Sequence, residues 1–244
     1  MQTRSLFLTL TVTMLGLTGP VLAQHASPSQ SSELKAVFAR LDKTAAAFRS
    51  AEASFEWDQY TKAVDETDKQ QGKVYFRKVG GNVEMAAHVV GPTDTTKSIA
   101  SSAAERYVLF SGGKVQLFQP SADHLDIYNA GKSSDAVESF LVLGFGGSSR
   151  DMLKSFDVTY GGHENIGGAD TDRLELTPKS EKVKNMFNHI ELWIDSRGIS
   201  IQQKLMSGEG DYRLNKYSDI TLNQKISDNV FKLKTTGKTT IETH

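Results

Sequence analysis

The stretch Tyr107–Pro120, YVLFSGGKVQLFQP, decides the fold class of this chain. Two apolar segments flank Ser111–Lys114, a glycine turn of the kind that joins neighbouring antiparallel strands, and Pro120 ends the second segment. Bulky apolar residues stand at consecutive positions, as in Val108 and Leu109. Because successive side chains of a strand point to opposite faces, this hairpin must be covered on both faces.

Strand patterns continue on both sides of this hairpin. Upstream, Ala53, Phe55 and Trp57 alternate with polar residues, and Lys73–Arg77 resumes the pattern after the polar stretch Asp65–Gln71, which predicts a long hairpin. Further strands are predicted at Val83–Val90, from Leu125 onward, and at Phe156–Tyr160, Thr171–Leu176, Asn188–Asp195, Ile199–Met206, Asp211–Tyr217 and Val230–Leu233. Since no helices separate them to make parallel crossovers, the sequence predicts one large antiparallel meander.

The sequence of the N-terminal region indicates a signal peptide followed by a helix. Arg4, the apolar run Leu6–Leu17 and the small residues of Val21–Ala23 are typical of a secretory signal, with cleavage before Gln24. The alternative, a membrane anchor, is disfavoured because the apolar run is short and is closed by helix breakers. Residues 24–244 are then one domain, and apolar residues at helical spacing predict an amphipathic helix over about 32–50.

Two short helices are predicted midway, on either side of a glycine cluster. The first begins near Ser133 or Ser134, and the second is Ser149–Ser155, capped by Ser148 with Asp151 in a pattern like a capping box. Helices laid over a strongly twisted, partly closed sheet enclose an apolar volume. From the pattern alone, a ligand cavity and a core filled completely by side chains remain equal alternatives.

Composition and motifs favour a protein without catalytic chemistry. The chain has 28 Lys and Arg against 29 Asp and Glu and no cysteine, which gives no electrostatic case for binding nucleic acid and excludes thiolate metal sites and thiol nucleophiles. The cluster Gly144–Gly147 follows an apolar helix and lacks the lysine of a phosphate loop. Asp123–Asp126 is better explained as a solvated turn than as a metal site, and no GxSxG serine motif is present. We expect no enzyme activity, no metal and no cofactor.

The order of these elements resembles the periplasmic outer-membrane lipoprotein carrier proteins, the LolA-like family. Four stretches carry the resemblance, which covers nearly the whole mature chain: Tyr107–Pro120, Ser139–Gly147 followed by Asp151-Met-Leu, Leu174–Lys179 with Ile190–Asp195 and Gly198, and Asp228–Leu233. The chain departs from the family pattern at Asn82–Ala87, which lacks the arginine and tryptophan of the equivalent strand, and at Thr235–Gly237, which lacks a proline.

The resemblance implies a mainly β, α+β fold: a large antiparallel half-barrel, incompletely closed, with short helices over its hydrophobic concavity. It also implies a periplasmic carrier that holds lipoprotein acyl chains or a similar lipid and passes them between membranes, with transient partners at the inner and outer membranes. We expect a monomer that does not bind nucleic acid. The alternative is an envelope lipid or stress sensor, an interaction module with the same half-barrel.

Two sets of residues are the candidates for this function. The predicted cavity wall is Phe38, Leu41, Phe55, Trp57, Tyr75, Leu109, Leu117, Leu141, Phe145, Leu192 and Trp193. The predicted lid and its hinge are Gly144, Gly146, Gly147, Met152 and Leu153. Ligand release would require the lid helices to move about the glycines.

Overall fold

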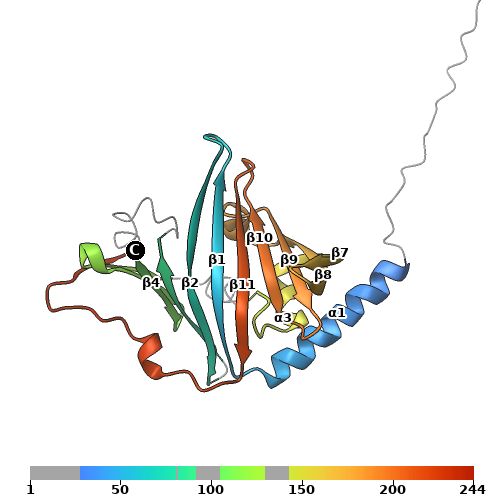
Figure 1. Ribbon diagram of the computed structural model, residues 1–244, viewed down its shortest axis with the longest axis horizontal. Coiled ribbons are helices and arrows are strands. Elements are labelled where there is room, and N and C mark those ends of the chain that lie inside the picture. The colour runs from blue at the N-terminus through green and yellow to red at the C-terminus, as the bar shows by residue number, and fades with distance from the viewer. Residues whose placement is uncertain (1–27, 81, 92–104, 130–142) are drawn as a thin grey trace, which may run out of the picture.

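A single curved sheet of twelve strands dominates the computed structural model, which describes residues 28–80, 82–91, 105–129 and 143–244 (Figure 1). Its strands are β1 (Ser50–Thr61), β2 (Glu66–Val79), β3 (Asn82–Val90), β4 (Arg106–Ser111), β5 (Lys114–Gln119), β6 (His124–Asn129), β7 (Phe156–Ile166), β8 (Ala169–Pro178), β9 (His189–Asp195), β10 (Ser200–Met206), β11 (Tyr212–Leu222) and β12 (Thr240–Thr243).

The strand order shows two meanders joined side by side. The order is β12-β6-β5-β4-β3-β2-β1-β11-β10-β9-β8-β7, so that β1 at the start of the first meander pairs with β11 at the end of the second. All pairs are antiparallel except β12 with β6. The two outermost strands, β12 and β7, stand at opposite ends of the sheet. The predicted open half-barrel is therefore confirmed, although two meanders replace the single one expected.

Helix α1 (Pro28–Ala47) packs on the inner face of the second meander. Val37 and Leu41, one helical turn apart, are buried against Leu174 and Leu192 of β8 and β9. The helix is the one predicted, but it begins earlier and ends before β1 takes up Ser50. No helix in the described residues is both long and apolar enough to cross a bilayer.

Polar contacts fix α1 to the strands beneath it. Arg40 forms an ion pair with Asp172 of β8, and Thr44 Oγ1 donates to the Arg197 carbonyl at 2.5 Å in the β9–β10 turn. Gly198 in that turn has a φ of +76°, and a Cβ there would lie 2.7 Å from the Arg40 carbonyl oxygen. Glycine thus lets the turn approach the helix backbone closely.

The second mid-chain helix forms as predicted. It is α3 (Ser149–Ser155), and its cap Ser148 accepts a hydrogen bond from the Asp151 amide at 3.2 Å. The first mid-chain helix lies outside the described residues. A one-turn helix, α4 (Glu181–Lys184), follows β8, and the 3-10 turn η2 (Pro120–Ala122) joins β5 to β6.

Two strand predictions need correction. Val230–Leu233 is not a strand: the 3-10 turn η4 (Asp228–Phe231) occupies its first half, and the sheet instead gains β12 near the end of the chain. Asp65–Gln71, expected as a polar connection, is almost entirely part of β2. Cross-strand pairing with β1 along its whole length, from Glu66 opposite Thr61 onward, outweighs the low β propensity of these polar residues.

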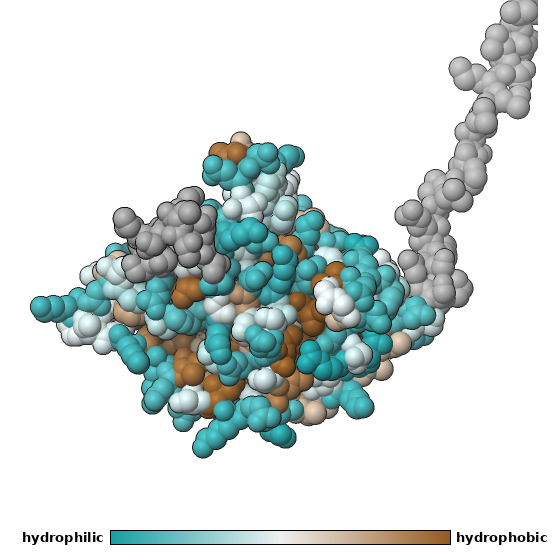
Figure 2. All heavy atoms as spheres, in the orientation of Figure 1, coloured by the Kyte–Doolittle hydropathy of each residue, from teal (hydrophilic) through white to brown (hydrophobic). Residues whose placement is uncertain are grey.

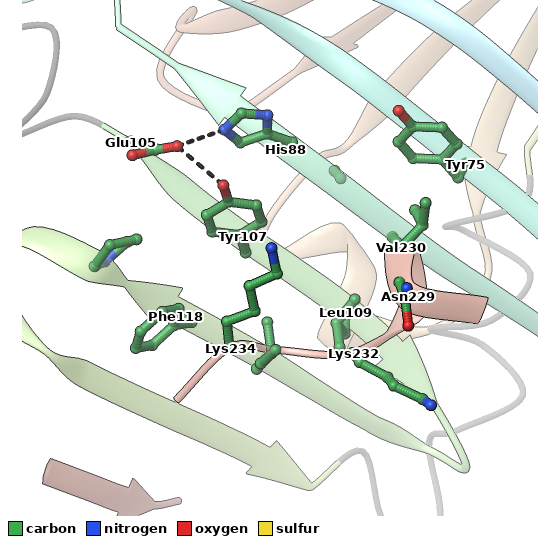
Figure 3. Close-up of a pocket in the computed structure, with 14 residues that line it drawn as sticks. Tyr75, His88, Glu105, Tyr107, Leu109, Phe118, Asn229, Val230, Lys232 and Lys234 are labelled. Carbon is green, nitrogen blue, oxygen red and sulfur yellow. Dashed lines mark hydrogen bonds and ion pairs between the residues drawn. The ribbon is translucent and has the colours of Figure 1, made fainter. Parts of the chain in front are cut away.

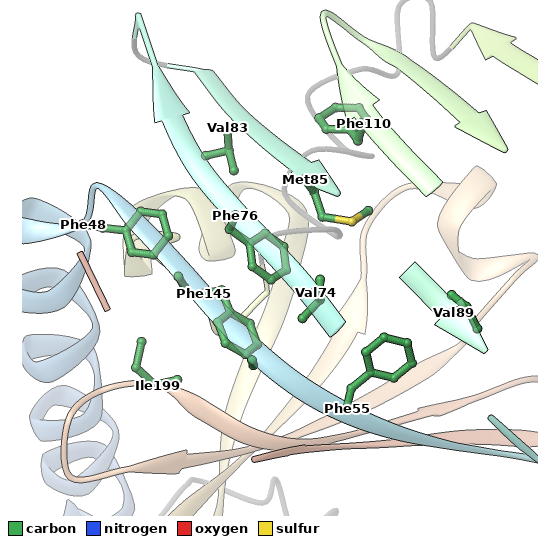
Figure 4. Packing of buried hydrophobic residues seen from close by; sticks show 12 residues of the cluster. Phe48, Phe55, Val74, Phe76, Val83, Met85, Val89, Phe110, Phe145 and Ile199 are labelled. Carbon is green, nitrogen blue, oxygen red and sulfur yellow. The ribbon is translucent and has the colours of Figure 1, made fainter. Parts of the chain in front are cut away.

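The core is divided into two apolar clusters. The first, which we call the β1–β4 cluster, is shown in Figure 4 and includes Phe55, Val74, Phe76, Met85 and Phe145. The second, the helix cluster, joins α1 and α3 to β7–β10 and includes Val37, Leu41, Leu143, Met152, Leu174, Ile190, Leu192 and Leu205.

Candidate functional site

An apolar hollow lies on the inner face between the two clusters, and we call it the inner hollow. It has a volume of about 240 Å³. Because it spans the line where β1 meets β11, both meanders contribute to it. Its wall is formed by Phe55, Trp57, Val74, Phe76, Met85, Ala87, Val89, Val108, Leu143, Ile190, Gln203, Leu205, Arg213, Asn215 and Tyr217.

The loop at residues 143–148 closes one end of the inner hollow. The Phe145 ring is fully buried, stacked on Phe76 at 4.9 Å between ring centroids and against the edge of Tyr217 at 4.8 Å. The Leu143 carbonyl accepts a hydrogen bond from Gln203 Nε2 at 2.6 Å. The loop is thus held by an aromatic plug and by bonds to its own backbone.

The glycines of this loop are in close contact with the core. Gly144 and Gly146 have φ values of +78° and +82°, a region that other residues rarely adopt. A Cβ on Gly144 would lie 2.1 Å from the Cβ of Ser200, and one on Gly146 would lie 2.5 Å from the Phe48 ring. Both glycines are therefore tightly packed against the core in this structure. A hinge at these positions remains a prediction.

The other end of the inner hollow is polar. The inner-face residues of β1 run in order from Ala51 to Gln59, and Arg213 of β11 pairs with Gln59. Burial, together with the positive charge of Arg106, lowers the pKa of Arg213 to about 10. The Arg213 guanidinium lies 3.9 Å from the centre of the Trp57 ring. Cationic and apolar groups thus adjoin at this end.

A second pocket lies on the opposite, outer face of the first meander, and we call it the outer pocket (Figure 3). Its volume is about 460 Å³. Figure 3 shows His88 and Tyr107 side by side, both directed to Glu105, whose carboxylate is 2.7 Å from His88 Nε2 and 3.0 Å from the Tyr107 hydroxyl. Those two hydrogen bonds lower the pKa of Glu105.

The chain after β11 covers the outer pocket, and we call residues 223–239 the strap. Val230 and Leu233 of the strap line the pocket. Arg77 of β2 fixes η4, since its guanidinium is 2.5 Å from Asp228 and 3.9 Å from the centre of the Phe231 ring. The strap supplies the cover that strands with apolar residues on both faces require.

The predicted wall residues are distributed over both faces. Phe55 and Trp57 line the inner hollow, and Tyr75 and Leu109 line the outer pocket. Leu117 is half-buried on the inner face, opposite Val108, without lining the inner hollow.

The other predicted residues belong to the core, to the outer face or to segments not described. Leu41 and Leu192 are buried in the helix cluster, with Phe38 packed against it. Trp193 lies on the outer face, where its indole N–H donates to Glu164 at 2.8 Å, because it follows Leu192 on one strand and the two side chains point to opposite faces. Leu141 lies outside the described residues.

The two apolar residues predicted for the lid differ in exposure. Met152 is buried in the helix cluster, whereas Leu153 is 41% exposed. Gly147 lies in the loop before α3. The sequence patterns did not predict the polar end of the inner hollow. The available signal was the alternation of Arg213, Asn215 and Tyr217 on one face of the predicted strand Asp211–Tyr217.

Among the residues that the structure describes, one group of possible metal ligands comes together. His124, Asp126 and Glu242 offer ligand atoms within 4.8 Å of one another, because β12 lies beside β6. The Asp126 carboxylate already has two imidazole partners, His244 at 3.0 Å and His124 at 3.3 Å, and these hydrogen bonds lower its pKa. Hydrogen bonds thus account for the proximity of His124 and Asp126, and the group lies at the β12 edge of the sheet.

Apolar side chains also reach the molecular surface. Figure 2 shows them as brown patches within polar surroundings over the middle of the view. Large exposed apolar residues include Val64, Val79 and Tyr128.

Comparisons with known proteins identify the fold. No family model matches the chain, and no curated protein matches it. An uncharacterized conserved protein from Thermus thermophilus superposes with a TM-score of 0.52 at 9% identity, over 87% of this chain and 99% of that one.

Two further structures are similar at lower scores. The LolA superfamily protein NE2245 from Nitrosomonas europaea gives a TM-score of 0.40 at 14% identity, over 82% of this chain and 97% of that one. A chain of the Pseudomonas aeruginosa MucA/MucB complex gives 0.43 at 13% identity, over 83% of this chain but only 60% of its own length. Likeness at such identities concerns the fold alone. With its open sheet, its two meanders and the helix across its inner face, the protein shares its fold with the Thermus thermophilus structure.

Proposed function

We propose that this protein is a non-catalytic carrier that binds the acyl chain of a lipoprotein or a similar lipid in the inner hollow. The observation that carries the proposal is the inner hollow itself, about 240 Å³ between two apolar clusters. Each buried CH₂ group contributes about 0.8 kcal/mol, so an apolar wall withdraws a lipid chain from water without any reacting group.

The same proposal covers where the ligand lies and how it enters. Phe55 and Trp57 contact the chain directly, while Leu41 and Leu192 support the wall from the helix cluster. Because Phe145 closes one end, a longer chain requires the 143–148 loop to withdraw, with Gly144 and Gly146 as its pivots. Withdrawal exposes an aromatic ring, which opposes opening until a ligand replaces it.

The predicted signal peptide and the resemblance of the sequence to the LolA-like family support a periplasmic location. There the protein would take its ligand from one membrane and deliver it to the other, with transient partners at each. We expect the protein to do this as a monomer.

The test uses two neighbouring residues of β4 that point to opposite faces. Val108 lines the inner hollow and Leu109 lines the outer pocket. We expect Val108→Trp to fill the inner hollow and to lower uptake of a fluorescent fatty acid at least tenfold. Leu109→Trp adds the same ring on the other face, and with it we expect uptake within twofold of the wild type.

Native mass spectrometry of the mature protein gives an independent readout, because a carrier retains an amphiphile through purification. Equal uptake by the two variants, or no uptake of any amphiphile by the wild type, contradicts the proposal. Circular dichroism confirms that both variants are folded, since overpacking costs about 1–3 kcal/mol.

A sensor or interaction module is the second candidate, and the outer pocket favours it. That pocket combines apolar walls with polar groups near the surface, among them His88, Glu105, Lys232 and Lys234. An envelope protein captured by the wild type and by Val108→Trp, but lost with Leu109→Trp, would support this function over the carrier.

A further inference from the structure

The polar end of the inner hollow holds an arginine without a counterion. Arg213 lines the hollow, and its guanidinium lies over the Trp57 ring at 3.9 Å. Its Nε donates to the neutral Gln59 side chain at 3.2 Å. Arg106 of β4 also lies on the inner face, where it donates to the amide oxygen of Gln70.

Other arginines of the described chain that are partly buried are neutralised by carboxylates. Arg40 pairs with Asp172, Arg77 with Glu84 and Asp228, Arg173 with Glu164, Glu175 and Glu191, and Arg197 with Asp195. Within residues 28–80, 82–91, 105–129 and 143–244, Arg213 and Arg106 are the partly buried arginines that form no ion pair and donate hydrogen bonds to amide oxygens instead. Because buried cations are normally paired, this difference needs a cause.

The surroundings of Arg213 disfavour its positive charge, and no nearby carboxylate of the described residues neutralises it. Burial is the main cause that lowers its pKa, and Arg106 acts in the same direction. Asp68 is the acidic residue on the same cross-strand line, since Gln59 of β1 pairs with Arg213 on one side and with Asp68 on the other. It does not neutralise Arg213, because it lies two strands away, roughly 10 Å, and its side chain is exposed. A site that keeps two cations together in a desolvated place is typical of function rather than of stability.

The Trp57 side chain supplies a second, independent observation. Its indole Nε1 is buried and has no hydrogen-bond partner among the described residues. An indole N–H can only donate, so it needs an acceptor. One residue of the wall thus carries an unpaired donor and lies against an arginine that forms no ion pair.

We propose that the polar end binds the anionic head of an amphiphile, a carboxylate or a phosphate, while the tail lies along the apolar wall. Arg213 and Arg106 supply the positive charge, and the Trp57 N–H is a further donor. The inference rests on the proposed carrier function and narrows its ligand class: an acidic amphiphile with its head at the arginines, in place of a neutral lipid.

The inner hollow orients such a ligand along the β1–β11 line. Arg213 stands at the Gln59 level of β1, and Phe145 stacks on Phe76, which pairs with Ala51 of β1. The head therefore binds at the end remote from the aromatic plug, and the tail extends toward the 143–148 loop.

The experiment compares palmitate, methyl palmitate and inorganic phosphate as ligands of the mature protein. Tryptophan fluorescence of Trp193→Phe reports the hollow directly, since the chain has only two tryptophans and Trp57 remains. A charge-assisted hydrogen bond justifies an expected preference of roughly tenfold or more for palmitate over its ester. We expect Arg213→Gln and Arg106→Gln each to reduce palmitate affinity by about that factor and to leave the ester unchanged.

Arg150→Gln is the matched control, because it removes the same charge from an exposed position on α3. It should bind palmitate as the wild type does. Equal affinity for palmitate and its ester in the wild type, or an equal loss of both in Arg213→Gln, overturns the inference while leaving the carrier function intact. If neither palmitate nor its ester binds, the carrier function itself fails. Phosphate binding as tight as palmitate binding overturns the amphiphile and identifies a site for free anions.

A stability measurement separates a binding role from a structural one. Arg213→Met removes an uncompensated charge and keeps an apolar chain on Trp57. If the role of Arg213 is to bind a ligand, the ligand-free variant should therefore melt at the same temperature as the wild type or at a higher one. Loss of several degrees in the ligand-free variant, with unchanged palmitate preference, shows a structural role and contradicts the proposal.

Discussion

At the residue scale, Phe145 is the most informative side chain of the glycine-rich loop. It has no exposed surface, and it contacts β2 and β11 through Phe76 and Tyr217. We expect Phe145→Ala to lower the free energy of unfolding by about 3–5 kcal/mol, because the ring leaves a cavity between the two meanders. Urea denaturation measures this, with Leu153→Ala as control, since Leu153 is 41% exposed and should cost under about 1 kcal/mol.

If Phe145→Ala lowers the free energy of unfolding no more than Leu153→Ala does, the 143–148 loop is readily displaced. The result therefore bears on the mechanism as well as on stability. A large loss means that a ligand must compensate for the ring whenever the loop withdraws.

The glycines of this loop permit a test of steric fit against backbone strain. Gly146 and Gly112 both have positive φ, +82° and +59°, but a Cβ on Gly146 meets the Phe48 ring at 2.5 Å whereas one on Gly112 meets nothing within 4 Å. Gly112→Ala should lower the free energy of unfolding by about 1–2 kcal/mol, because alanine is strained in the left-handed conformation but meets no neighbouring atom there. We expect Gly146→Ala to cost at least about 1 kcal/mol more, measured by thermal or urea unfolding. Equal losses would show that Phe48 moves aside freely.

At the element scale, the strap shows where sequence patterns lose information. Val230–Leu233 has the composition of a strand, yet Arg77 binds Asp228 and Phe231 and holds the segment as a 3-10 turn across the outer face. Conversely, all four residues of β12 are exposed, and the strand has no apolar alternation. Its position follows from Asp123, which accepts hydrogen bonds from Thr236 and Thr239 at 2.8 and 2.6 Å. Contacts between residues more than a hundred positions apart decide both segments.

Glu84 makes the attachment of the strap depend on pH. Although burial raises the pKa of this carboxyl, hydrogen bonds from Ser111 and Arg77 hold it below its usual value. A carboxyl whose folded pKa is depressed stabilises the fold fully above its unfolded pKa, about 4.3, and loses that contribution as pH falls through the folded value. We expect the strap to loosen below about pH 4, as backbone NMR signals of residues 226–234 should show.

Two variants complete this test. Arg77→Ala should produce the loosened spectrum already at pH 7, because η4 loses its ion pair and its ring contact. Glu52→Gln is the control, since Glu52 forms an exposed pair with Lys73 elsewhere on the sheet and should leave the strap's pH profile unchanged. A wild-type strap that keeps its signals unchanged down to pH 3 contradicts the role given to Glu84.

At the scale of the whole molecule, periodicity predicted the type of most elements but not their partners. The hairpin Tyr107–Pro120, α1 and the Ser148 cap were recognisable because the determining contacts are local. The pairing of β1 with β11 joins segments about 160 positions apart, and nothing in either strand specifies it. That pairing joins the two meanders, and residues of both line the inner hollow.

The site was harder to predict for the same reason. The sequence identified apolar residues but not the face of the sheet on which each side chain lies. Leu192 and Trp193 were both predicted for the cavity wall, although the side chains of neighbouring residues on a strand point to opposite faces. Arg213 escaped notice because its significance comes from what surrounds it, a tryptophan face and a second arginine contributed by other strands.

Because both meanders contribute to the inner hollow, a bound ligand should couple them. At a ligand concentration 100 times the dissociation constant, binding stabilises the native state by about 2.7 kcal/mol, which for a domain of this size raises the melting temperature by roughly 5–10 °C. Scanning calorimetry with palmitate should show this rise in the wild type and in Leu109→Trp, and no rise in Val108→Trp. Hydrogen exchange should slow together in β2–β4 and in β9–β11, since residues of both groups line the hollow. Slowing confined to β3–β5 and the strap would instead place the ligand in the outer pocket and assign the carrier role to the opposite face.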